Sequence, residues 1–237
     1  MNRTESPSRR SLDRHRLLAD LAWPDASDRA PGTVLALPVG ATEQHGPHLP
    51  LCTDTEIAVA LADGLSRARP CVVVAPPVAY GSSGEHSGFA GTLSIGQEAI
   101  ELLLVELGRS ASLSFPRMLV ISTHGGNAQP LRRATRRLGA EGRDVRAFFP
   151  NWSQDAHAGR AETSMMLALA PDRVRLRRAE PGVTVPLEQL LPRLLATGVR
   201  AVSPNGVIGD PAGASADEGR ALLRRGVEQL IGVVDAW

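Results

Sequence analysis

The residues best suited to chemistry lie in one short stretch, residues 41–54, which follows the apolar run 33–40. Glu43 and His45 stand two positions apart, and Asp54 follows where a helical pattern begins. Residues two apart in an extended segment point to the same side, so the carboxylate of Glu43 and the imidazole of His45 can converge. Carboxylates and imidazoles in this combination bind zinc, iron or manganese. The simpler alternative is a polar surface loop in which Asp54 only caps a helix.

Further candidate ligands come directly after other apolar runs. His124 follows residues 118–122, whereas His157 and Glu162 follow residues 145–149. The carboxyl ends of parallel strands line one crevice, so we expect these side chains to approach Glu43, His45 and Asp54. Together they exceed what one zinc ion needs. Two metals about 3.5–4 Å apart would instead share one carboxylate as a bridge.

The elements that must position these residues alternate between strand and helix, which is typical of an α/β fold with a mainly parallel sheet. We expect strands at 33–40, 71–77, 118–122 and 145–149, and helices at 17–23, from 53 onward, 97–107, 131–138, 162–170, 187–196 and after 215. Pro24 should end the first helix, and capping boxes at 53–56 and 215–218 should begin two others. Residues 1–12 are polar and arginine-rich, which predicts disorder, and residues 13–237 should form one domain.

Composition excludes several classes of protein. The 43% hydrophobic and 22% charged residues are ordinary for a globular protein, and a net charge of +1 points to no polyanionic partner. Aromatic residues make up 3%, which argues against a surface that stacks nucleic-acid bases. No apolar run is long enough to span a membrane. The two cysteines are too few for a disulfide framework, so we expect a reduced, cytoplasmic protein.

Several polar or aromatic residues near the predicted strand ends have two open interpretations. His86, in a Gly/Ser-rich loop, is either a surface residue or a pocket wall. Asn127 either caps the following helix or binds substrate. Trp152 could form part of an apolar wall that holds substrate beside His157, which itself could be catalytic or could brace the next helix. Cys52 can bind metal, but its apolar neighbour favours simple packing.

The assembled motifs resemble those of the creatininase family of amidohydrolases over nearly the whole chain. The resemblance rests on an ordered set of segments: Glu43-x-His45-Gly-Pro-His48-Leu-Pro, Asp54, Gly84-Glu-His86, His124-Gly-Gly-Asn127, His157-Ala-Gly-x-x-Glu162-Thr-Ser and Asn205-Gly-Val-x-Gly-Asp-Pro211. It implies a three-layer α/β/α sandwich with a dinuclear metal centre, in a protein that often forms homo-oligomers.

The resemblance also implies roles for individual residues. Glu43 and His124 would hold one metal and His45 the other, with Asp54 as the bridge. Creatininases carry a glutamate where this chain has Gly126, so the second metal lacks a ligand unless Glu162 supplies it. The loops resemble those of family members that cut a modified precursor peptide, which implies release of a C-terminal Val-Tyr dipeptide.

These inferences predict a hydrolase that contains two divalent metals, zinc or iron and possibly manganese. Such a metal pair activates water for attack on an amide carbonyl. His157 is the candidate general acid, with His86, Asn127 and Trp152 as candidate substrate-binding residues. Two alternatives stay open: a formamide or cyclic-amide hydrolase with the same centre, and a binding protein without activity.

Overall fold

The computed structural model of the chain describes residues 16–152 and 156–237, so the disorder predicted for residues 1–12 lies outside the described residues. The strands are β1 (Val34–Val39), β2 (Val72–Val74), β3 (Arg117–Ser122) and β4 (Asp144–Phe148). The α-helices are α2 (Trp23–Arg29), α3 (Thr53–Ala68), α4 (Gly96–Ala111), α5 (Ala128–Ala140), α6 (Arg160–Leu169), α7 (Leu187–Val202) and α8 (Ala216–Asp235). Short 3₁₀ helices include η2 (Leu18–Asp20), η3 (Gly84–His86), η4 (Gly125–Asn127), η5 (Pro171–Arg173) and η6 (Leu176–Arg178).

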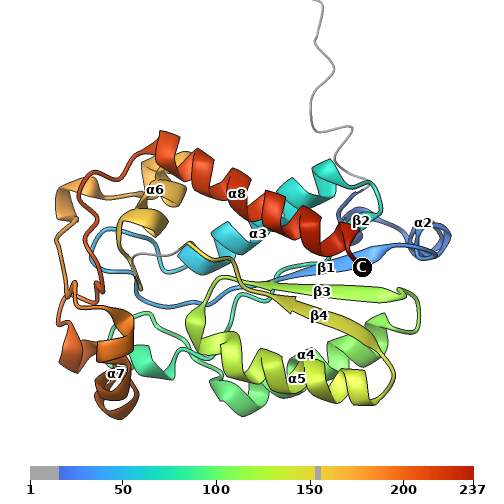
Figure 1. Cartoon of the computed structure of the whole chain (residues 1–237), viewed down its shortest axis with the longest axis horizontal. Helices are drawn as coiled ribbons and strands as arrows, with labels where there is room; N and C mark the ends of the chain where they lie inside the picture. Colours follow the sequence, from blue (N-terminus) through green and yellow to red (C-terminus); the bar gives the residue numbers. More distant parts are fainter. Residues whose placement is uncertain (1–15, 153–155) are drawn as a thin grey trace, which may run out of the picture.

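The four strands pair in the order β2-β1-β3-β4, and every pairing is parallel. The helices α3 and α8 cover one face of the sheet, and α4 and α5 cover the other (Figure 1). This confirms the predicted α/β/α layers and parallel sheet. Because both faces are covered, β1 is buried along its whole length and reads as a continuous apolar run.

Two hydrophobic cores lie between these layers, one on each face of the sheet. On the first face, Ile57, Leu61 and Leu65 of α3 are buried at helical spacing. On the second, Ile100 and Leu104 of α4 pack into the other core. The two cores clamp the sheet, so the carboxyl ends of its strands have fixed positions.

Pro38 occupies a position in the central strand β1 where proline is normally unfavourable, since it cannot donate to a ladder. The N–H groups of Val34 and Gly40 both donate toward the side of β2. The N–H that Pro38 lacks would point the same way, at a level where β2 has already ended at Val74. The proline therefore costs the sheet no hydrogen bond.

The structure corrects three details of the predicted elements. Pro24 lies in the first turn of α2 and begins that helix rather than ending one, because a first-turn N–H needs no helical partner. Thr53 does not cap α3 but donates from its hydroxyl to the carbonyl of Pro50, whereas the Ser215 cap of α8 is confirmed. The helix predicted for residues 187–196 continues to Val202 as α7, with a break at Gly198, whose φ is 74°.

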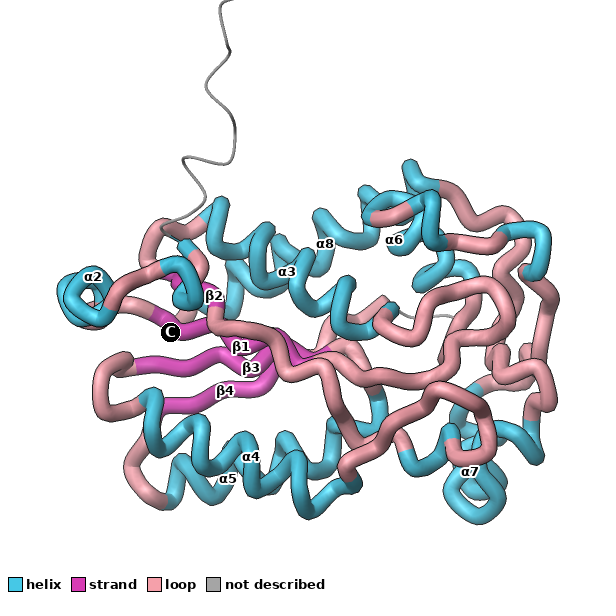
Figure 2. Tube along the Cα trace, turned by 180° about the vertical axis from the view of Figure 1, so that it is seen from behind, coloured by secondary structure: helices cyan, strands magenta, loops and turns pink. Residues whose placement is uncertain are grey.

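Long loops gather at the end of the sheet toward which the strands run, between α6 and α7 (Figure 2). They include the segment after β1 and the loop between β2 and α4. No helix within residues 16–152 and 156–237 has the length and apolar character needed to cross a membrane.

Candidate metal centre

The loop after β1 brings Glu43 and His45 to one place. Both residues are fully buried. The N–H of Glu43 donates to the carbonyl of Leu51, and His45 pairs with Leu49, so the loop folds back on itself. The extended backbone places both side chains on the same side of the loop, as the sequence predicted.

Asp54 reaches the same place because the start of α3 approaches the end of β1 very closely. A Cβ atom on Gly40 would lie 2.4 Å from the Cα of Thr55, so only glycine permits this approach. The hydroxyl of Thr123, at the end of β3, donates to the carbonyl of Asp54 over 2.7 Å. Two neighbouring strand ends therefore fix the backbone of Asp54, from which its carboxylate enters the cluster.

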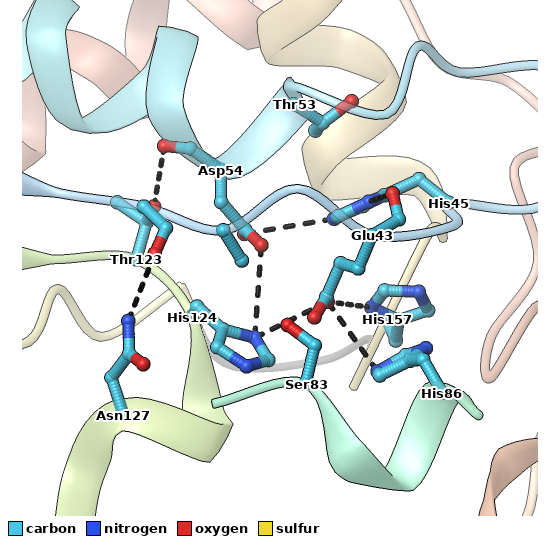
Figure 3. A network of polar contacts seen from close by, with 12 residues as sticks. Glu43, His45, Thr53, Asp54, Ser83, His86, Thr123, His124, Asn127 and His157 are labelled. Atoms are coloured by element: carbon cyan, nitrogen blue, oxygen red, sulfur yellow. Dashed lines mark hydrogen bonds and ion pairs between the residues drawn. The ribbon is translucent and has the colours of Figure 1, made fainter. Parts of the chain in front are cut away.

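His124 follows β3, and one ring nitrogen is committed to the backbone. Its Nε2 donates to the carbonyl of Ser82 over 2.8 Å, so in the neutral ring that binds a metal the lone pair lies on Nδ1. Nδ1 lies 3.2 Å from Oε1 of Glu43 and 3.6 Å from Oδ2 of Asp54 (Figure 3). The hydrogen bond to Ser82 is the kind of partner that orients a metal-binding histidine.

His157 and Glu162 approach from the loop before α6 and from its first turn. The backbone of His157 pairs with Ile208 in both directions, and Nε2 of its ring donates to the carbonyl of Gln44 over 2.8 Å. Ala158 has a φ of 53°, a strained conformation for a residue with a Cβ atom. Its N–H donates to Oε2 of Glu162 over 2.6 Å, which directs the carboxylate toward His45, 3.9 Å away.

These residues form overlapping sets of donors that fit metal ions. Two sets share Asp54 and match the predicted pair of sites: Glu43, Asp54 and His124 on one side, and His45, Asp54 and Glu162 on the other. A third set joins His157 to Glu43 and His45. Both oxygens of Glu43, Nε2 of His45 and Oδ2 of Asp54 are buried without a hydrogen-bond partner among the described residues. Buried polar atoms without partners are costly, and cations in these sets would satisfy all of them.

The carboxylates and imidazoles of the cluster shift one another's pKa values. Burial alone would raise the pKa of Glu43, but His124, His86 and His157 together lower it well below its usual value. Burial would lower the pKa values of His45 and His124, but facing carboxylates raise both to about 10. The pKa of Glu162 rises to about 7, chiefly through burial. The site therefore attracts positive charge, as protons or as metal ions.

His157 and His86 differ from the other two histidines because burial dominates their titration. It lowers the pKa of His157 well below the usual value and that of His86 to about 4. Both imidazoles are therefore neutral at neutral pH. Nδ1 of His157, which carries its lone pair, lies 3.7 Å from Oε1 of Glu43, so this nitrogen can take up a proton beside the cluster.

The remaining candidates divide between the cluster and its surroundings. His86 is buried, with Nε2 3.4 Å from Oε1 of Glu43, so it lines the cluster and is not a surface residue. His48 instead braces the loop through Thr163, with 2.8 Å between Nε2 and Oγ1. Cys52 faces Arg173 and Glu56 and stands outside the donor sets.

Two predicted substrate-binding residues need correction. Asn127 is fully buried, and its amide braces the loops: Oδ1 accepts from the N–H of Ser82, while Nδ2 donates to the carbonyl of Gly40. It stands at the N-cap position of α5, but its side chain makes no capping hydrogen bond and is too buried to reach substrate. The ring of Trp152 packs against the core near Leu61 of α3 and Gly226 of α8, so it does not form a wall of the cluster.

Sequence reasoning missed Gln44 and Ser83, which are both buried. The hydroxyl of Ser83 has no hydrogen-bond partner among the described residues, and the amide of Gln44 contacts two histidines. Gln44 lies between two predicted ligands, so its place in the sequence was the available signal. Ser83 gave none, since serine is common in Gly/Ser-rich loops.

A family model named Creatininase, described as creatinine amidohydrolase, matches residues 19–234. The chain belongs to the creatininase family. Its relatives include the mycofactocin precursor peptide peptidases of Mycolicibacterium smegmatis, 48% identical over 212 residues, and of Mycobacterium ulcerans, 46% identical over 217 residues. Each match covers 86% of this chain and 85% of the relative. The creatinine amidohydrolase of Pseudomonas putida is 28% identical, over 92% of this chain and 95% of that protein.

Solved structures agree with this assignment. The crystal structure of a creatinine amidohydrolase superimposes with a TM-score of 0.75 at 26% identity, covering 93% of this chain and 96% of that one. Similar creatininase structures include a manganese form and a zinc-containing mutant. Together with the donor cluster, they support the use of divalent metal ions by this chain, a hydrolase that acts on amide bonds.

Proposed function

We propose that this chain is the peptidase of mycofactocin maturation, which releases a C-terminal Val-Tyr dipeptide from the modified precursor peptide. The observation that carries the proposal is the 46–48% identity to two peptidases of that name, against 28% to a creatinine amidohydrolase. The dipeptide itself comes from the resemblance of the loops to family members that cut a precursor peptide.

Gly126 also favours a substrate other than creatinine. Creatininases carry a glutamate at this position, but here a Cβ atom would lie 2.2 Å from the carbonyl oxygen of Ser82 and 2.5 Å from Nε2 of His124. No side chain fits while the 82–85 loop keeps this path. We propose Glu162 as the ligand in its place. The second metal would then be held from α6 and not from the segment after β3.

The proposed mechanism assigns each residue a separate task. Glu43, Asp54 and His124 would hold one divalent cation, and His45, Asp54 and Glu162 the other, which together would polarise the amide carbonyl and activate a water. His157, held through its Nε2–H by Gln44, would accept a proton at Nδ1 and deliver it to the leaving nitrogen. The buried, neutral His86 would line the substrate side of the cluster.

The test is a product assay with several substrates. Metal-loaded protein is incubated with the modified precursor peptide, with creatinine and with a formamide, and products are identified by mass spectrometry. The proposal expects the peptide to lose its C-terminal dipeptide, with little turnover of the other two. Turnover of the formamide alone would support the second candidate, a formamide hydrolase, and loss of a different fragment would overturn the proposed cleavage site.

Zinc, iron and manganese all suit this donor set, so the native metal is a further part of the proposal. Elemental analysis of protein purified without chelators identifies it, with zinc or iron expected. The homo-oligomer and the cytoplasmic location remain predictions, and light scattering on the purified protein tests the first.

A further inference from the structure

The side-chain amide of Gln44 has one possible orientation. Its Oε1 accepts from the N–H of Gly46 over 2.9 Å, and its Nε2 lies 3.1 Å from the carbonyl oxygen of Gly206. Turning the amide over would place oxygen against oxygen at Gly206 and N–H against N–H at Gly46. Two backbone groups therefore fix Nε2 on the side of the histidines.

This orientation determines where His86 carries its proton. Nε2 of Gln44 can only donate, and it lies 2.8 Å from Nδ1 of His86. That ring nitrogen must then accept, so the proton of the neutral imidazole lies on Nε2. This is the nitrogen that points at Glu43, 3.4 Å from Oε1.

His157 presents the opposite character to the same carboxylate. The main-chain carbonyl of Gln44 can only accept, so Nε2 of His157 carries a proton and donates to it. Nε2 therefore cannot also accept from the Gln44 amide, whose two N–H groups go to Gly206 and His86. Nδ1 of His157 is left with a lone pair, 3.7 Å from Oε1 of Glu43.

We propose that Gln44 is a positioning residue that sets the tautomers of the two histidines, so that His86 faces the substrate as a hydrogen-bond donor and His157 as an acceptor. An amide substrate needs both: a donor for the carbonyl oxygen, which gains negative charge, and an acceptor for a proton. The proposal depends on the amide hydrolysis of the family and holds whichever amide is cut.

The segment after α7 supports this arrangement. Gly206 has a φ of 80°, and a Cβ atom there would lie 1.9 Å from Oε1 of Gln44, so glycine is required beside the amide. Two residues later, Ile208 pairs with the backbone of His157. The Asn205–Pro211 motif thus holds Gln44 and His157 together, which gives it a task away from the metal ligands.

The first test uses the unmodified protein. Zinc-loaded chain labelled with ¹⁵N at histidine is examined by long-range ¹H–¹⁵N correlation, which reports the protonated nitrogen of each neutral ring. A His86→Gln variant assigns the His86 signals, and His157→Gln those of His157. We expect both rings to be protonated at Nε2. A proton on Nδ1 of His86 overturns the proposal.

The second test changes the amide. Gln44→Glu keeps the shape but offers only acceptors, so His86 should move its proton to Nδ1, while His157, held by the backbone carbonyl, should keep its tautomer. The same change at the exposed Gln129 should alter neither ring. An unchanged His86 tautomer in Gln44→Glu would show that the amide does not control it.

Kinetics separate positioning from a merely structural role. The uncharged Gln44→Met should lower kcat by about 10–100-fold, the usual loss when a residue that orients an active-site histidine is removed. KM and metal content should stay nearly unchanged. Added to His86→Ala, the same substitution should cost much less, since its effect passes through His86. Full additivity of the two substitutions would contradict the proposal.

Discussion

Nε2 of His45 lies 3.9 Å from Oε2 of Glu162, and no described residue gives that nitrogen a hydrogen bond. The two side chains come from different elements, the loop after β1 and the first turn of α6. Glu162 thus stands where a carboxylate is needed to complete the donor set of His45 and Asp54. This relationship makes the second metal position testable.

Replacing Glu162 by glutamine should remove one metal ion per chain. The amide keeps the shape but withdraws the negative charge offered beside His45, so metal content should fall from two toward one, with a native circular dichroism spectrum. The control is Glu188→Gln, which alters an exposed glutamate in the first turn of α7. If the Glu162 variant still binds two metals, a residue other than Glu162 completes the second metal site.

Replacing Asp54 by alanine should affect both metal positions. Its Oδ1 faces His45 and its Oδ2 faces His124, each at 3.6 Å, so one carboxylate serves both donor sets. We expect elemental analysis to find little of either metal in the variant. Asp172→Ala, on an exposed turn, is the matched control. Retention of a single metal would show that Asp54 does not bridge.

His157→Ala should retain its metals and lose turnover. The backbone pairing with Ile208 needs no side chain, so the loop should keep its path, while the proton acceptor at Nδ1 disappears. A loss of about 10²–10⁴-fold in kcat is typical of a general acid or base. The measurement is turnover per bound metal pair. If that value stays at the wild-type level, His157 only braces the loop.

Metal binding should release protons and strengthen with pH. Without metal, the carboxylates around His45 and His124 outweigh burial and hold both pKa values at about 10, so both rings are protonated at pH 7. Each must lose its proton to bind a cation, so each site should gain about tenfold in affinity per pH unit until pH approaches 10.

Calorimetry in buffers of different ionisation enthalpy counts the released protons. At pH 7 we expect about two per chain from His45 and His124, with a further fraction from Glu162, whose pKa is about 7. The folding stability of the metal-free protein should change with pH in the opposite direction to its metal affinity. Its raised histidine pKa values stabilise it fully below pH of about 6.5, and this stability is lost as pH rises toward 10. A metal affinity that does not change between pH 6 and 8 would show that His45 and His124 are not protonated in the metal-free protein.

Gly126→Ala should destabilise the fold, because the added Cβ atom meets the Ser82 carbonyl oxygen at 2.2 Å. Overpacking of this kind costs about 1–3 kcal/mol, which lowers Tm by several degrees. Gly139→Ala, in the open on α5, should instead raise Tm slightly. Restoring the family glutamate through Gly126→Glu starts from the same clash and should not yield a creatininase. An unchanged Tm in Gly126→Ala would show that the 82–85 loop moves to make room for the added Cβ atom at no cost in stability.

Much of this arrangement could be predicted from local patterns. The α/β fold followed from apolar runs alternating with helical spacing, and the grouping of Glu43, His45, Asp54, His124 and Glu162 followed from their places at strand ends. Such patterns work because parallel strands end at one edge, where loops must meet.

The failures concern residues whose role depends on contacts distant in sequence. Asn127 looked available to substrate, but its amide closes hydrogen bonds with Ser82 and Gly40, which no local pattern reveals. Trp152 looked like a pocket wall, but its ring packs against Gly226 of α8 and Leu61 of α3. The Thr53 capping box failed because Thr53 is already the first residue of α3 and Cys52 holds the N-cap position, while the Thr53 hydroxyl donates to the carbonyl of Pro50.

The parallel strand order has a consequence for how the chain reaches its working form. Each pairing of β1 with β2, β1 with β3 and β3 with β4 needs a helical crossover, so the contacts are distant in sequence and slow to form. The donors of one metal set come from two distant parts of the chain: His45 and Asp54 lie in the stretch between β1 and the first turn of α3, and Glu162 lies at the start of α6. The segment from β1 to α3 alone lacks Glu162, so a cation finds its full set of ligands only after α6 has docked beside it. Metal then binds the folded chain and does not nucleate its folding. It stabilises the native state in proportion to the logarithm of the free metal concentration.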